Sequence, residues 1–191
     1  MRDLDILIVG VGGQGTVLAS KICGFVAEAA GMDVKLSEIH GMSQRGGSVV
    51  THVRMGKKVY SPLIAEGKAD IILAFEELEA LRWLSFLKPD GKVVLNTQKI
   101  LPMPVIVGKA EYPKSVVAEL KDMRIDTYAC DATGIAYDLG NSRAANLVLI
   151  GNLAKQIGLD KGIFLDAIRA IVKPKFIDLN IAAFEAGYNI L

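Results

Sequence analysis

Residues 4–15 read Leu-Asp-Ile-Leu-Ile-Val-Gly-Val-Gly-Gly-Gln-Gly, an apolar run that stops at a cluster of glycines. The run from Leu4 to Val9 predicts a buried strand. Thr16 to Ala30 carries apolar residues at helical spacing, and Gly31 predicts the end of that helix. Val34 to Glu38 predicts a second strand. Strand, glycine turn, helix and strand in this order predict a right-handed βαβ unit with parallel strands.

The glycine turn satisfies the pattern G-x-G-x-x-G, and its candidate ligand-binding residues are Gly10, Gly12, Gly13, Gln14 and Gly15. Glycines allow a tight turn and a close approach of the backbone to a ligand, and the following helix N-terminus favours an anion. Glu38 falls where a dinucleotide fold places its ribose-binding acid. Three interpretations stay open: a turn without a ligand, a phosphate or other anion, or NAD(P). The chain leaves little room for a substrate domain beside a full dinucleotide fold, which argues against NAD(P).

A polar segment follows the second strand, and its candidate functional residues are His40, Ser43, Gln44, Arg45, Gly46 and Gly47. In an open α/β sheet the loops at the carboxyl ends of strands line the ligand crevice, so we expect this segment and the glycine turn to share one edge. Arg45 could contact a carboxylate or phosphate through two hydrogen bonds, and His40 could donate a hydrogen bond or act as an acid or base. The competing interpretation is a turn histidine beside a solvated arginine.

The rest of the chain alternates strand and helix patterns. Ser48 to Met55 predicts a strand, and Met55-Gly56-Lys57-Lys58 predicts a turn into an antiparallel strand at Val59–Tyr60. Further strands are expected at 69–75, 92–96, 105–107 and 125–130, with helices at 76–87 and 115–123. Beyond Asp131 the pattern predicts helices at 132–139, 144–157, 161–171 and 176–185.

These patterns predict an α/β fold, a three-layer α/β/α arrangement with a mixed, mostly parallel sheet and a Rossmann-like start. We expect one domain over residues 1–191, with an α/β core over 1–140 and a helical C-terminal portion over 141–191.

Charge and cysteine content narrow the class of protein. The chain has 191 residues, 22 basic and 21 acidic, so its net charge of +1 gives no reason to expect a nucleic-acid or membrane partner. Two cysteines, Cys23 and Cys130, sit in apolar runs and are expected to be buried and unpaired. No signal peptide and no apolar run of membrane-spanning length is visible, so we expect a cytoplasmic protein.

Three stretches carry a resemblance to a known family. Residues 9–15 (VGVGGQG) and 37–54 (SEIHGMSQRGGSVVTHVR) resemble the gamma domain of the 2-oxoacid:acceptor oxidoreductases, and H-G-M-x-Q-R-G-G looks like the beta subunit of the indolepyruvate enzymes. Residues 142–151 (SRAANLVLIG) are similar to the following helix of that family. The resemblance covers most of the chain.

The resemblance implies a small subunit that completes a larger enzyme. In such enzymes thiamine diphosphate decarboxylates the 2-oxoacid, iron–sulfur clusters pass electrons to ferredoxin, and coenzyme A takes the acyl group. The resemblance implies that the thiamine and cluster sites belong to a large alpha subunit. The present sequence agrees with this, because two distant cysteines cannot ligate a four-cysteine cluster. We therefore expect no cofactor on this chain, no catalytic residue among the candidates, and self-association to a homodimer when it is isolated. An independent nucleotide-binding enzyme and a plain scaffold remain the alternatives.

Overall fold

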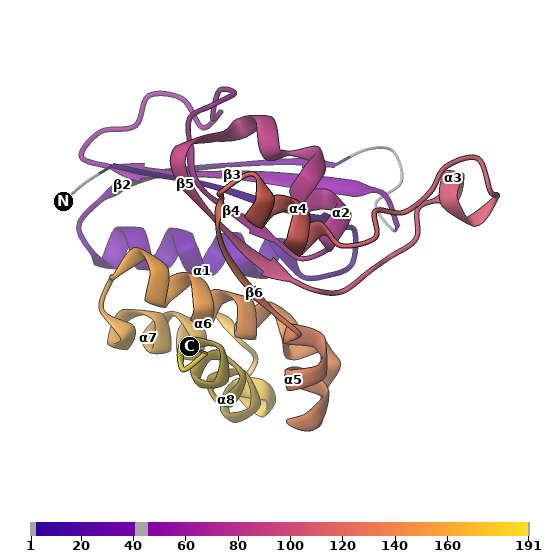
Figure 1. Ribbon diagram of the computed structural model, residues 1–191. Coiled ribbons are helices and arrows are strands. Elements are labelled where there is room, and N and C mark those ends of the chain that lie inside the picture. Colours follow the sequence, from indigo (N-terminus) through magenta and orange to yellow (C-terminus); the bar gives the residue numbers. More distant parts are fainter. Residues whose placement is uncertain (1–2, 41–45, 191) are drawn as a thin grey trace.

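The computed structural model describes residues 3–40 and 46–190 (Figure 1). The strands are β1 (Leu4–Val11), β2 (Asp33–His40), β3 (Ser48–Gly56), β4 (Ala69–Ala74), β5 (Leu87–Asn96) and β6 (Asp126–Cys130). The helices are α1 (Thr16–Ala29), α2 (Glu77–Arg82), α3 (Met103–Ile106), α4 (Val116–Asp122), α5 (Ala132–Asp138), α6 (Ala145–Ile157), α7 (Lys161–Ile171) and α8 (Ile177–Tyr188). Three short 3-10 turns are η1 (Leu84–Phe86), η2 (Ser142–Ala144) and η3 (Pro174–Phe176).

The strands form one six-stranded sheet in the order β2-β3-β1-β4-β5-β6. β1, β4, β5 and β6 pair in parallel, whereas β3 is antiparallel to both of its neighbours, β1 and β2. Five strands therefore run in one direction and β3 runs against them. This confirms the predicted mixed, mostly parallel sheet. β1 and β2 are parallel, as the βαβ pattern predicted, but β3 lies between them.

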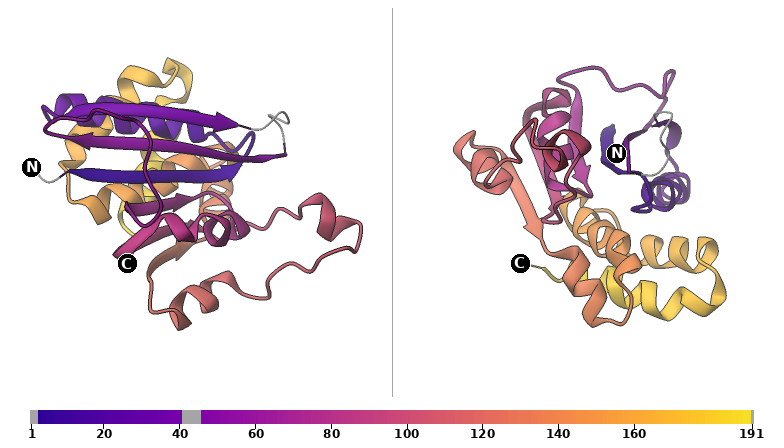
Figure 2. Two further views of the ribbon diagram at one scale, coloured as in Figure 1. Left: turned by 90° about the horizontal axis from the view of Figure 1, so that it is seen from above. Right: turned by 90° about the vertical axis from the view of Figure 1, so that its right-hand side faces the viewer.

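Helices cover both faces of the sheet (Figures 1 and 2). On β1, Ile6 and Ile8 belong to a core cluster that includes side chains of α1, α6, α7 and α8. Leu7 and Val9 belong to the opposite cluster, which includes side chains of α2 and α4. Because β1 is buried on both faces, its sequence is a continuous apolar run rather than an alternating one. The C-terminal helices thus share a core with the sheet.

α6 and α8 touch at the level of their backbones. A Cβ atom on Gly187 would lie 1.8 Å from the carbonyl oxygen of Val148, and one on Gly151 would lie 2.0 Å from that of Phe184. No side chain fits in either position. The glycines therefore set the distance between the two helices.

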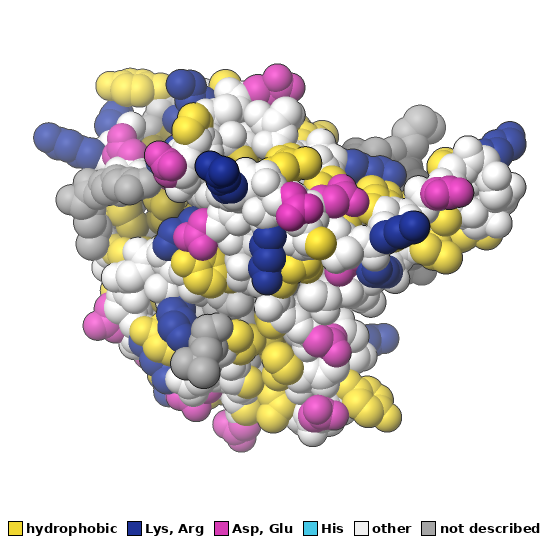
Figure 3. Space-filling view, in the orientation of Figure 1, with side chains coloured by type: hydrophobic (Ala, Val, Ile, Leu, Met, Phe, Trp, Pro, Cys, Tyr) yellow, Lys and Arg dark blue, Asp and Glu magenta, His cyan; other side chains and the backbone are white. Residues whose placement is uncertain are grey.

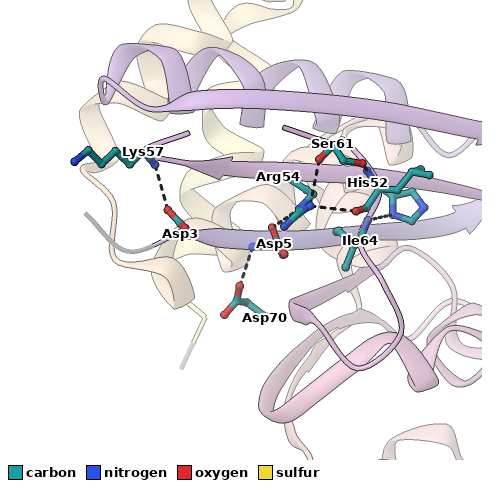
Figure 4. A network of polar contacts seen from close by, with 9 residues as sticks. Asp3, Asp5, His52, Arg54, Lys57, Ser61, Ile64 and Asp70 are labelled. Carbon is teal, nitrogen blue, oxygen red and sulfur yellow. Dashed lines mark hydrogen bonds and ion pairs between the residues drawn. The ribbon is translucent and has the colours of Figure 1, made fainter. Parts of the chain in front are cut away.

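The predicted hairpin strand at Val59–Tyr60 is wrong. Both edges of β3 are already paired, so no edge remains for a hairpin partner. The loop after β3 instead crosses the sheet and is held by polar contacts (Figure 4). Arg54 pairs with Asp5 at 2.9 Å and donates to the carbonyls of Ser61 and Leu63, both at 3.2 Å.

The second anchor of this loop is a buried histidine. The Ile64 N–H donates to Nδ1 of His52 at 3.1 Å, and burial lowers the pKa of His52 below its ordinary value. His52 is therefore held as the neutral tautomer with its proton on Nε2.

Two further predicted boundaries differ from the structure. The predicted helix 76–87 ends at Arg82, and the sequence Lys88-Pro89-Asp90-Gly91 after it, which is typical of a turn, lies within β5. Asp90 takes a left-handed φ of 61°, and the pairing of β5 with β4 shifts between Ala69 and Ile71, so β5 absorbs the turn as an irregularity.

Charged side chains of both signs are interspersed over the face of the molecule in Figure 3. Within residues 3–40 and 46–190, no helix combines the length and the apolar character that crossing a bilayer would require.

Candidate functional site

The glycine turn and the segment after β2 meet at one edge of the sheet. Val49, near the start of β3, pairs with Gly10 on one side and with His40 on the other. The Gly12 N–H donates to the Gly47 carbonyl at 2.9 Å, and the Gly46 N–H donates to the Gly12 carbonyl at 3.4 Å. The expectation that both segments share an edge is confirmed for the described ends of the polar segment, His40 and Gly46–Gly47. We call the contact of Gly10–Gly15 with Gly46–Gly47 the glycine rim.

Glycine is required at different positions of the rim for different steric reasons. Gly13, Gly15 and Gly46 take left-handed φ angles of 106°, 90° and 80°, which residues with a Cβ rarely adopt. A Cβ on Gly10 would lie 2.9 Å from both Phe75 Cβ and Gln14 Oε1, so this position excludes a side chain.

The remaining predicted residues occupy different places. His40 ends β2, and its backbone pairs with that of Val49. Ser43, Gln44 and Arg45 lie outside the described residues. Glu38 accepts a hydrogen bond from the Ser20 hydroxyl of α1 at 2.9 Å. Because β3 separates β2 from β1, Glu38 lies one strand farther from the glycine turn than it would if β2 paired directly with β1.

Gln14 ties the glycine turn to the neighbouring strand ends. Its Oε1 accepts from the Val11 N–H at 2.7 Å, and its Nε2 donates to the Phe75 carbonyl and to Gln98 Oε1, both at 2.9 Å. The Val11 N–H can only donate, so it determines which end of the Gln14 amide is oxygen. Every part of this amide is used within the protein.

Asn96, at the carboxyl end of β5, plays the same structural role farther along the edge. Its Nδ2 donates to the Phe75 carbonyl and to Thr133 Oγ1, both at 3.1 Å. Its Oδ1 accepts from the Ala132 N–H at 3.1 Å, which ties β5 to the start of α5. Sequence reasoning missed Asn96 and Gln98, although their place just after a predicted parallel strand is a usable signal.

A pocket of about 610 Å³ opens beside Gly13–Gly15, and we call it the glycine-loop pocket. Its lining comes from the glycine turn before α1, from residues at or just after the ends of β4 and β5, from α5, and from the η2–α6 junction. The lining residues are Gly13, Gln14, Gly15, Phe75, Asn96, Gln98, Thr133, Ser142, Arg143, Ala145 and Asn146. Arg143 and Asn146 belong to the stretch whose resemblance was noted as a helix, and their place in a pocket with the glycine turn follows only from the tertiary structure.

Three buried glutamates follow β4 on the other side of the rim. Glu79 accepts from the Ser48 hydroxyl at 2.5 Å and so joins α2 to the start of β3. Burial raises the pKa of Glu79, and the hydrogen bond from Ser48 opposes that shift. Burial also raises the pKa of Glu77, whose carboxylate lies 3.5 Å from Lys99 Nζ.

The third glutamate, Glu76, closes the base of a long projection between β5 and α4. We call residues 97–115 the arm; it carries α3 and extends away from the body in Figures 1 and 2. One oxygen, Glu76 Oε1, accepts from the Ile100 N–H of the outgoing limb at 3.0 Å and from the Tyr112 hydroxyl of the returning limb at 2.5 Å. Burial and then the Glu76 carboxylate raise the pKa of Tyr112, which keeps its hydroxyl protonated.

The outer part of the arm is apolar and exposed. Leu101, Met103, Ile106 and Val107 are 50%, 69%, 62% and 58% exposed. Figure 3 shows apolar side chains along this projection. The predicted strand at 105–107 is wrong, because Pro102 and Pro104 lack the N–H that a ladder requires and instead suit the start of α3. An anchored base with an unpacked apolar tip is typical of an interaction element.

A mixed, mostly parallel sheet with helices on both faces defines an α/β protein, and it carries a glycine-lined rim, a polar pocket and an exposed apolar arm. Comparison with known proteins identifies the family. Residues 5–190 match the pyruvate ferredoxin/flavodoxin oxidoreductase family, and the chain belongs to it.

Individual relatives agree with this assignment. The chain is 44% identical to the indolepyruvate oxidoreductase subunit IorB of Thermococcus kodakarensis, over 98% of this chain and 95% of that one. The gamma subunit of a keto/oxoacid ferredoxin oxidoreductase from Geobacter sulfurreducens has the same fold, with a TM-score of 0.77, 22% identity, and coverage of 100% of this chain and 97% of that one. The fold recurs in the 2-oxoglutarate:ferredoxin oxidoreductase of Magnetococcus marinus, with a TM-score of 0.75 and 18% identity, where the match covers 100% of this chain and 31% of that one.

Proposed function

We propose that this chain is the small subunit of an enzyme that oxidatively decarboxylates indolepyruvate or another aryl pyruvate. In this proposal coenzyme A takes the acyl group, and ferredoxin takes the electrons. The observation that carries the proposal is the 44% identity to an indolepyruvate oxidoreductase subunit across nearly the full length of both chains. The independent nucleotide-binding alternative loses support because Glu38 is engaged by Ser20 and set apart from the glycine turn by β3.

The redox cofactors are assigned to a large partner subunit. An iron–sulfur cluster requires several thiolates, and the cysteines of this chain do not fit that need. Cys23 lies within the core, where burial raises its thiol pKa to about 12, and Cys130 ends β6, where burial raises its pKa to about 11. Thiamine diphosphate is bound together with a divalent cation that prefers oxygen ligands, and among the described residues no Asp or Glu lines the glycine-loop pocket.

The arm supports the assignment of a large partner. Its four apolar side chains lie beyond a base that charge-assisted hydrogen bonds hold in place, so the arm is ordered without being packed. It leaves the sheet at the carboxyl end of β5, beside the glycine-loop pocket. We propose that the arm docks in an apolar groove of the large subunit and places the glycine rim against that subunit's active centre. Without the partner, the same surface favours self-association.

In this assignment the chain supplies binding and positioning rather than a reacting group. The rim offers backbone N–H groups, and the pocket offers amide and guanidinium donors. Such groups hold an anionic cosubstrate and exclude water from a neighbouring active centre. No residue of this chain is proposed to exchange a proton or an electron with the substrate.

The test is reconstitution with the large subunit of an indolepyruvate oxidoreductase from the same organism. We expect reduction of a viologen dye that depends on 2-oxoacid and coenzyme A in the pair, and none with either polypeptide alone. Indolepyruvate, phenylpyruvate and pyruvate are compared at equal concentration, and the aryl substrates should give the higher kcat/KM. Full activity of the large subunit without this chain would refute the subunit role.

A further inference from the structure

We propose that Glu76 and Tyr112 are positioning residues for assembly, which fix the direction in which the arm meets the large subunit. The inference rests on the proposed function for the identity of that partner. The contacts that carry it are formed within this chain alone. We call the hydrogen bonds that join Glu76 and Tyr112 to Leu78 and Ile100 the arm latch.

Both limbs of the arm are bound to the N-terminus of α2. The first N–H groups of a helix have no acceptor within the helix itself. Here the Glu77 N–H donates to the Gln98 carbonyl of the outgoing limb at 3.1 Å, and the Leu78 N–H donates to the Tyr112 hydroxyl of the returning limb at 3.2 Å. Movement of either limb would deprive α2 of an acceptor, so the body of the protein opposes a change in the direction of the arm.

Glu76 is held in one orientation by the body of the protein. Its side chain is buried, and its Oε2 accepts from the Glu79 N–H at 3.0 Å. This leaves Oε1 to hold both limbs, through the Ile100 N–H and the Tyr112 hydroxyl. A carboxylate only accepts, so the Tyr112 hydroxyl donates to Glu76 while its oxygen accepts from Leu78. The arm latch therefore has one defined set of donors and acceptors.

The tip of the arm, which we define as residues 101–110, is suited to an apolar groove. The N–H groups of residues 105–110 all donate to carbonyls of residues 102–105, and Pro102 and Pro104 have no N–H. Most backbone donors of the tip are thus satisfied before it is buried, which removes a large cost of entering an apolar surface. The tip forms its own shape, so the arm latch contributes its direction.

The base of the arm also links the tip to the glycine rim. Gln98 Oε1 accepts from Gln14 Nε2 of the glycine turn at 2.9 Å. Lys99 Nζ donates to the Lys114 carbonyl at 3.3 Å and so joins the two limbs. An arm fixed at these points presents the tip and the rim to the partner in one geometry (Figures 1 and 2). Because that geometry exists before docking, little conformational entropy is lost when the arm binds.

The first test measures the order of the arm in the isolated full chain by 15N relaxation. Backbone order parameters at residues 105–110 should equal those of the sheet, and Tyr112→Phe should lower them from about 0.85 to below about 0.6. Tyr137→Phe removes an exposed hydroxyl on α5 and should change nothing. Equal order in the parent and Tyr112→Phe would overturn the inference. If Tyr112→Phe does not fold, Lys99→Gln, at a side chain 44% exposed, takes its place with the same criterion.

The second test asks whether the arm latch acts through the tip. Calorimetry with the large subunit should show at least fivefold weaker binding for Tyr112→Phe and no change for Tyr137→Phe. In an Ile106→Asp background, where the apolar contact of the tip is already lost, Tyr112→Phe should weaken binding less than twofold. The same fivefold loss in both backgrounds would show that Tyr112 acts elsewhere and would overturn its positioning role.

The failures of the two proposals can be told apart. Reconstituted activity together with an arm that stays equally ordered in Tyr112→Phe would leave the proposed function standing and overturn the arm latch. An arm that loses its order in Tyr112→Phe, together with an inactive pair, would overturn the proposed function and with it the assigned partner of the arm.

Discussion

Gln14→Ala is predicted to be among the most damaging small changes on the glycine rim. The change deletes three hydrogen bonds, to the Val11 N–H, the Phe75 carbonyl and Gln98 Oε1. Val11 is only 8% exposed, so its N–H loses its acceptor with little access to water. An orphaned buried donor costs about 1–3 kcal/mol, and each of the other two bonds contributes about 0.5–1.5 kcal/mol.

The Phe75 carbonyl keeps its second donor, Asn96, so losing the hydrogen bond from Gln14 to this carbonyl should cost only about 0.5 kcal/mol. The expected loss in free energy of unfolding is therefore about 2–5 kcal/mol. Gln98→Ala is the matched control, because it removes only the bond from Gln14 at 2.9 Å and a long bond from Asn96 at 3.5 Å, and it should cost about 1 kcal/mol.

Urea unfolding of the three proteins measures the difference, followed by circular dichroism and by the fluorescence of Trp83, the one tryptophan of the chain. Coincident transitions with both probes would validate a two-state comparison. If Gln14→Ala unfolds at the same urea concentration as Gln98→Ala, the amide is not the link between the glycine turn and the strand ends. The reasoning for the whole edge would then fail.

Three further predictions concern other parts of the molecule. Gly187→Ala places a methyl group 1.8 Å from the Val148 carbonyl oxygen and should lower the free energy of unfolding by about 3 kcal/mol. The control Gly158→Ala is strained only by its φ of 70° and should lower it by about 1 kcal/mol. Comparable losses in the two variants would contradict the close packing of α6 and α8. The pKa of His52 is lowered in the folded state, so this residue contributes stability above its ordinary pKa of 6.5 that is lost as pH falls through the lower folded value. Urea midpoints are measured as the pH falls from about 7, above the ordinary pKa of 6.5, to about 5. They should fall less steeply in His52→Asn than in the parent, and parallel curves would exclude the mechanism. Ile106→Asp on the arm should weaken association with the large subunit at least tenfold without changing the melting temperature of the chain. The control Met123→Asp, at a similarly exposed apolar position after α4, should leave association unchanged. Size-exclusion chromatography of mixed subunits measures association, and calorimetry measures the melting temperature.

Local patterns in the sequence determined most of the fold. The buried apolar run of β1, the glycine turn and the amphipathic α1 are readable because strand burial, turn sterics and helical periodicity act between residues close in the chain. The same holds for the succession of C-terminal helices and for the glycine turn as a candidate ligand loop. The polar segment after β2 could be expected at the same edge because parallel strands end on the same side.

Tertiary structure alone decided how those pieces combine. β3 inserts between β1 and β2, which leaves no edge for the expected hairpin and moves Glu38 away from the glycine turn. The pocket joins Gly15 to Asn146 and Arg143, residues more than a hundred positions away in the chain. Strand order and such long-range contacts depend on which edges pair and which surfaces pack. These are properties of the whole chain, and no window of the sequence contains both partners of such a contact.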